Sequence, residues 1–144
     1  MNPPKEQGIS RKGLGAAFKR EEIKKSNLLL DIQLLRAQQK GSDEIVAKFA
    51  QAASLEEHLS QCCARKGLRE KFFVHRFSAA SCWAGAGNFY RALVLCDELL
   101  KLRDLPDALR QRIQQYSLII RARRVRLNAE IAETSEITEV AMAA

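Results

Sequence analysis

The sequence contains few of the residues that interrupt helices. Only three prolines and seven glycines occur among 144 residues, and these two residue types fit a helix interior worst. Two of the prolines and three of the glycines fall within residues 1–15. The rest of the chain can therefore form long helices. It has too few glycines and prolines for the many turns that a fold of short strands needs. We expect an all-α fold.

Long apolar runs are also absent. No stretch approaches the roughly 18 apolar residues of a membrane-spanning helix. The first residues, MNPPK, lack the apolar core of a signal peptide. The sequence thus predicts no membrane span and a cytoplasmic location.

Familiar catalytic patterns are missing as well. There are only two histidines, no glycine-rich phosphate loop and no strand–turn–helix nucleophile. The adjacent acidic pairs Glu56-Glu57 and Asp97-Glu98 would point about 100° apart on a helix, so neither forms a carboxylate dyad. We therefore expect no enzymatic activity and no cofactor.

The four cysteines form no Cys-x-x-Cys pair and lie beside apolar residues. Buried, reduced thiols are the favoured interpretation. His58 and Cys62 are four residues apart on one face of a predicted helix, which is half of a metal site. Because no second pair of ligands accompanies them, we predict no bound metal.

What the chain does contain is a succession of apolar, helix-compatible segments. Residues 1–15 are rich in Pro, Gly and Lys and are predicted to be a disordered basic tail. Residues 16–129 are predicted to be a single helical domain, and residues 130–144 either a C-terminal helix extension or a flexible tail. About five antiparallel helices are expected, over residues 16–39, 43–65 and 107–128 and on both sides of a turn at 85–88.

Glycines separate these predicted helices. Gly41 suits the end of the first helix and Ser42 the N-cap of the second. Gly67 is expected to end the second helix. At the central turn, Gly87 is suited to the left-handed backbone that ends one helix, and Asn88 to the N-cap of the next.

The stretch around the central turn, residues 74–106, resembles a tetratricopeptide repeat, a helix–turn–helix unit of 34 residues. The small, aromatic, glycine, alanine and proline positions of that pattern fall on Ala80, Trp83, Gly87, Phe89, Ala92 and Pro106. The chain departs from the pattern at Arg76, Ala79, Cys96 and Leu99. The resemblance covers roughly a quarter of the chain and implies stacked helical hairpins, with the last helix as a terminal cap.

The resemblance also implies a partner-binding groove, lined by the first helix of each hairpin. In this sequence the groove residues would be Val74, Phe77, Ser78, Ser81 and Gly85. They include no Lys or Asn to clamp a C-terminal carboxylate, so an apolar peptide or helix is the better fit. The competing interpretation is that the first two helices cover these residues.

Two rows of arginine mark the last predicted helix, in a chain whose formal net charge is +7. Their spacings of 11 and 3 residues place each row on one stripe, and together they form a candidate anion-binding surface: Arg110, Arg121 and Arg124, then Arg112, Arg123 and Arg126. The alternative is a solvated face whose arginine stems cover apolar surface.

The sequence therefore favours a scaffold or adaptor that binds a protein partner, with self-association left open. The first alternative is a basic helical protein that binds nucleic acid through the arginines. This alternative is not favoured, because no aromatic interleaving or recognition-helix pattern accompanies the charge. A second alternative is a small helical bundle with a regulatory or secretion-chaperone role.

Overall fold

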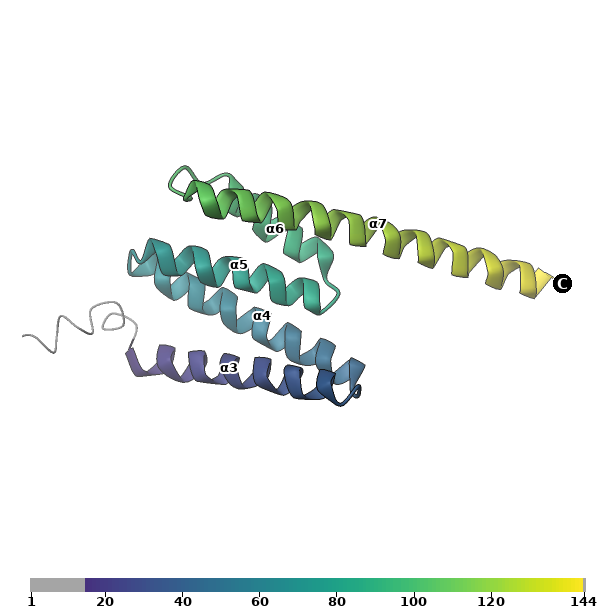
Figure 1. The fold of residues 1–144 in the computed structure, drawn as a ribbon, viewed down its shortest axis with the longest axis horizontal. Helices are drawn as coiled ribbons and strands as arrows, with labels where there is room; N and C mark the ends of the chain where they lie inside the picture. The colour runs from purple at the N-terminus through teal and green to yellow at the C-terminus, as the bar shows by residue number, and fades with distance from the viewer. Residues whose placement is uncertain (1–14, 144) are drawn as a thin grey trace, which may run out of the picture.

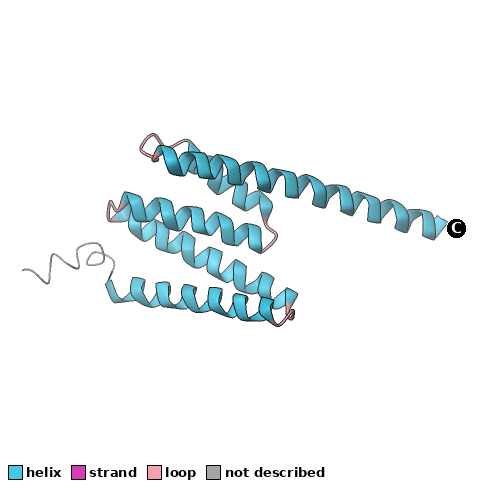
Figure 2. Ribbon diagram, viewed as in Figure 1, coloured by secondary structure: helices cyan, strands magenta, loops and turns pink. Residues whose placement is uncertain are grey.

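The computed structural model describes residues 15–143, with side chains for residues 15–136. The predicted tail at 1–15 lies outside this range except for Gly15. Five helices and their short connections make up the described chain, which contains no strand (Figure 2). They are α3 (Gly15–Ala37), α4 (Ser42–Arg65), α5 (Arg69–Gly85), α6 (Phe89–Leu100) and α7 (Asp107–Ala143). The prediction of an all-α fold with stacked antiparallel helices is confirmed.

The helices form a zigzag in which each packs most extensively on its neighbours in sequence (Figure 1). In that view α4 and α6 lie behind α5 and α7, so α3, α5 and α7 share the front layer. Side chains also join the front helices directly. The Phe18 ring of α3 meets His75 of α5 edge-on, and Phe77 of α5 meets Tyr116 of α7 in the same way.

Two of the connections follow the predicted glycine chemistry. Gly67 and Gly87 have φ of 70° and 80°, which is left-handed backbone that glycine adopts without a Cβ clash. After each glycine, the next backbone N–H donates to a carbonyl five residues back, Leu68 to Cys63 at 2.9 Å and Asn88 to Trp83 at 2.8 Å. The Asn88 side chain accepts from the Arg91 N–H at 3.1 Å, as an N-cap does.

The connection between α3 and α4 differs from the prediction. Gln39, with φ of 55°, is the left-handed residue that ends α3, and the Lys40 N–H donates to the Leu35 carbonyl. Gly41 (φ 67°) is the N-cap of α4, and Ser42 lies inside the helix. The placement of Gly41 after α3 and of Ser42 at the N-cap is therefore wrong. The left-handed backbone of Gly41 favours glycine there, and a Cβ would also crowd a Glu44 carboxylate oxygen at 3.3 Å.

Small side chains of α5 allow the layers to approach closely. Ala79 and Ala80 are fully buried against Leu95, Cys96 and Ile113. At the end of the same helix, a Cβ on Gly85 would lie 2.8 Å from the Phe49 ring of α4. Because these positions carry little or no side chain, α4, α6 and α7 can all pack on one helix.

Helix α7 is longer than the other helices and extends beyond them (Figure 1). Its first turns bury Ile113 and Ile120, but every side chain from Arg121 to Glu136 is exposed. The helix nevertheless continues to Ala143 and projects beyond the other helices (Figure 1). The described part of residues 130–144 is therefore helical. No described helix has both the length and the apolar character needed to cross a membrane.

Candidate interaction surfaces

The predicted groove residues lie along one stripe of α5, with different exposure. Val74 is 58% exposed and Ser81 is also exposed, whereas Phe77, Ser78 and Gly85 are half-buried. Phe77 packs edge-on against the Tyr116 ring at 5.4 Å, and Gly85 is the contact point for Phe49. The accessible part of the stripe is therefore Val74, Ser78 and Ser81.

Helix α3 adds apolar surface beside this stripe. The Glu21 carboxylate meets His58 of α4 at 2.6 Å, while the Glu22 carboxylate lies 4.0 Å from His75 of α5. One residue is about 100° of helix rotation, so Ile23 faces the open side of the front layer. Leu30 lies seven residues further along the same stripe, and both side chains are at least half exposed.

Helix α7 flanks α5 on the other side. Arg110 and Arg121 reach α6, whereas Tyr116 faces α5. Ile119, three residues after Tyr116, lies further toward the open side and is half exposed. Burial raises the pKa of the Tyr116 phenol, and the neighbouring Ser81 hydroxyl offsets part of that effect.

We call Ile23, Leu30, Val74 and Ile119 the front face.

The six arginines of the predicted anion-binding surface do not act as one set. Arg110 donates to the carbonyls of Leu100 and Leu102 at 2.6 and 2.7 Å and so caps the end of α6. Arg121 pairs with Asp97 of α6 at 3.3 Å, and Arg124 stacks 5.9 Å from the centre of the Tyr90 ring. Three others are exposed with no ion-pair partner among the described residues: Arg112, Arg123 and Arg126.

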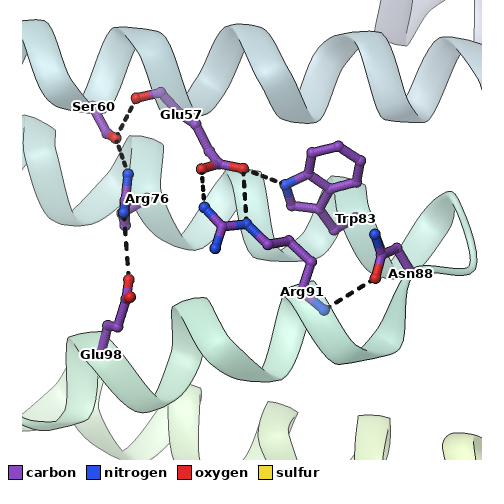
Figure 3. Close-up of polar contacts among 7 residues, drawn as sticks. All are labelled: Glu57, Ser60, Arg76, Trp83, Asn88, Arg91 and Glu98. Carbon is purple, nitrogen blue, oxygen red and sulfur yellow. Dashed lines mark hydrogen bonds and ion pairs between the residues drawn. The ribbon is translucent and has the colours of Figure 1, made fainter.

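A polar cluster ties α4, α5 and α6 together (Figure 3). The Glu57 carboxylate accepts from the Trp83 indole N–H at 2.5 Å and from the Arg91 guanidinium through both of its oxygens. Burial raises the pKa of the Glu57 carboxyl, but the hydrogen bonds from Arg91 and Trp83 and the nearby positive charges together lower it by more. The pKa of this carboxyl is therefore below 4.5. This carboxylate is engaged in holding three helices in register.

Beside it, Arg76 of α5 donates to the Ser60 hydroxyl at 3.2 Å and to the Glu98 carboxylate at 3.4 Å (Figure 3). The arginine thus spans from α4 to α6 across its own helix. Sequence reasoning did not find these pairs, because their partners are 16 to 34 residues apart in the chain.

A second polar group is fully enclosed. The Glu56 side chain is 3% exposed and meets His75 at 2.8 Å and Lys25 at 3.8 Å. A buried carboxylate needs such partners, because an isolated charge in the interior is costly. The sequence signal for this site is an acid within the apolar face of a helix: Glu56 lies among Ala52, Ala53 and Leu59.

Three of the four cysteines are buried, and Cys62 is half-buried. Burial raises the pKa of the Cys63 and Cys96 thiols and raises that of Cys82 to about 11. Cys62 lies 3.8 Å from His58, as their spacing predicts. Within residues 15–143, no group of three or more His, Cys, Asp or Glu side chains is arranged to hold a metal ion.

No family model matches this chain, and neither the curated proteins nor the solved structures contain a match.

Proposed function

We propose that this protein is a helical scaffold that binds an apolar helix or peptide segment of a protein partner on its front face. The observation that carries the proposal is that three alternate helices, α3, α5 and α7, each present a large, exposed apolar side chain toward the same open side. A gathering of such side chains on a folded surface is characteristic of interaction sites.

The polar residues at the edge of the front face indicate what kind of partner would bind there. Ser78 and Ser81 provide hydroxyls beside Val74, and exposed Arg112 borders the α7 side. An amphipathic helix with acidic residues next to its apolar anchors would match this pattern. The groove residues proposed here extend the predicted α5 stripe with Ile23 and Leu30 of α3 and Ile119 of α7.

The proposal includes a tetratricopeptide-like organisation. In it, α5 and α6 form one hairpin unit, α3 and α4 form a longer preceding unit, and α7 takes the place of the terminal helix. The support is the resemblance at the central turn, together with the front-layer position of the first helix of each hairpin (Figure 1).

Selection from a displayed peptide library tests the proposal directly. Peptides enriched by the wild-type protein should be helix-forming and amphipathic, and V74E should lose at least about tenfold in affinity because a charge would be buried at the interface. V46E is the matched control, since Val46 is an exposed valine on α4 in the back layer. Selected peptides that bind V74E and I119E as tightly as wild type would overturn the proposal.

Nucleic-acid binding is the second candidate, because Arg112, Arg123 and Arg126 are exposed without ion-pair partners. It predicts that affinity for RNA or DNA is micromolar or better at physiological salt and falls steeply with salt. It also predicts that reversing the charge of these three arginines abolishes binding. If the protein meets both expectations, the scaffold proposal loses its priority.

A further inference from the structure

The last part of α7 has no support from the rest of the described chain. Arg121 and Arg124 are the last residues seen to contact α6. Beyond them, residues 125–143 form a projecting segment of 19 residues, about 28 Å long at helical rise. In proteins most helical stability comes from packing of an amphipathic face and not from helix propensity, so this segment would be stabilised by a surface that packs against it.

One side of α7 has the pattern of a helix–helix seam. Leu118, Ala122, Val125, Ala129 and Ala132 recur at steps of four, three, four and three, which is the spacing that brings two helices together in a coiled coil. Leu118 is 68% and Val125 is 67% exposed, and the three alanines are exposed too. The alanines let a second helix backbone approach closely. We call these five residues the seam.

A row of charged residues runs beside the seam: Arg123, Arg126, Glu130 and Glu133. Within this row, Arg126 and Glu133 follow the d positions Val125 and Ala132 and so flank the seam at e positions, whereas Arg123 and Glu130 lie farther out at b positions. None of the four has an ion-pair partner among the described residues. The two arginines in this row are therefore not those that α6 engages.

We propose that the seam pairs with the same seam of a second copy of this chain, in antiparallel orientation. In antiparallel copies the e positions of both chains lie on the same side of the seam, so two copies crossing near Asn128 would bring Arg126 within about three residues, roughly 4.5 Å along the axis, of Glu133 of the second copy. In parallel copies the e positions lie on opposite sides of the seam, so these two charges would not meet. The complementary contact thus forms only when one copy is reversed.

This surface is independent of the front face. Val125, Ala129 and Ala132 lie in the projecting segment, beyond the stack that carries Ile23 and Val74. A dimer formed through the seam would hold two stacks at the two ends of a paired helix. Failure of one proposal leaves the other standing.

Sedimentation equilibrium tests the pairing. We expect the wild-type protein to reach twice the 16.2 kDa of one chain. V125E should raise the dissociation constant at least about tenfold, because it buries a charge in the seam. L127E is the matched control, since Leu127 is exposed on another side of the same segment. Wild type that stays monomeric, or L127E that dissociates as far as V125E, would overturn the proposal.

Charge and crosslinking tests address the orientation. R123E/R126E and E130R/E133R should each stay monomeric alone and associate when mixed. In a C62S background, an N128C variant should form an intermolecular disulfide, whereas S135C should not. The two Ser135 positions would be about 21 Å apart along the helix axes in antiparallel copies and at the same level in parallel ones. Equal crosslinking of both variants would refute the antiparallel arrangement. Circular dichroism of each variant checks that the stack stays folded.

Discussion

Two parts of this protein are equally helical but are held in different ways. In the stack, residues 15–124, each helix contacts its neighbours through buried alanines, leucines and isoleucines, and through polar groups such as Glu56 and Glu57. In the projecting segment, residues 125–143, the described side chains are exposed. Within the single chain, that helix is held by its backbone hydrogen bonds and by local contacts such as the one from the Thr134 hydroxyl to the Glu130 carbonyl.

The difference shows what helical periodicity encodes. Apolar residues recur at helical spacing in both parts. This spacing places them on one face of the helix but does not determine whether another surface contacts that face. Whether the face is buried depends on what lies opposite. In the stack the opposite surface belongs to the same chain, whereas in the projecting segment no described part of the chain lies opposite the face.

The largest expected contrast is between two glutamates. Glu56→Ala removes the buried carboxylate that pairs with His75 at 2.8 Å and with Lys25 at 3.8 Å, so we expect a loss of about 3–5 kcal/mol in the free energy of unfolding. Glu130→Ala in the projecting segment should cost less than about 0.5 kcal/mol. Urea denaturation followed by circular dichroism measures both. Similar losses would mean that Glu56 is not enclosed as described.

Isoleucines of α7 provide the next contrast within one helix. Ile113 is fully buried and Ile131 is 55% exposed. Ile113→Ala should lower the free energy of unfolding by about 2–4 kcal/mol, because it removes buried methyl groups and leaves a cavity. Ile131→Ala should change it by less than about 0.5 kcal/mol. If Ile131→Ala were the more damaging change, the projecting segment would have to be packed within the chain.

Two arginines of α7 should show a smaller difference in stability, because one has partners at the end of α6 and the other is exposed. Arg110→Ala leaves the Leu100 and Leu102 carbonyls without their donor, and we expect a loss of about 1–2 kcal/mol. Arg112→Ala, two residues away and exposed, should be nearly neutral. Thermal unfolding of the two variants distinguishes them. A neutral Arg110→Ala would show that the α6 end is stabilised by other means.

The smallest effect concerns pH. The pKa of Glu57 is below 4.5 in the folded protein and close to 4.5 once the chain unfolds. Its carboxylate therefore contributes its full stabilisation above about pH 4.5, and the contribution is lost as pH falls through the folded pKa. Glu57→Gln should be less stable than wild type at neutral pH and flatten the decline in acid. An unchanged pH profile in this variant would contradict the Arg91–Trp83 arrangement.

Local chemistry could be predicted where neighbours in sequence decide it. Gly67 and Gly87 end their helices because a left-handed residue is needed there, and Asn88 caps α6 with its own side chain. The same reasoning failed at the first connection, where Gln39 takes the left-handed position. A side chain pays only a modest strain in that conformation, so composition did not reveal which residue would adopt it.

The candidate surfaces were only partly predictable. The α5 stripe was visible as a periodic row, but periodicity did not show that Phe77 would be half-buried against Tyr116 or Gly85 against Phe49. The arginine rows were likewise read as uniform. Their division into Arg110, which caps α6, and Arg112, which is exposed, depends on where α6 ends relative to α7.

The sequence by itself determined that the chain is helical, and where most of its helices end, because spacing, glycine and capping residues act within a few positions of the backbone. Only the tertiary structure decided which apolar stripes are covered, which charges are paired and at which residue α7 stops contacting the other helices. Those outcomes depend on contacts between residues tens of positions apart, and helix lengths and crossing geometry set these contacts.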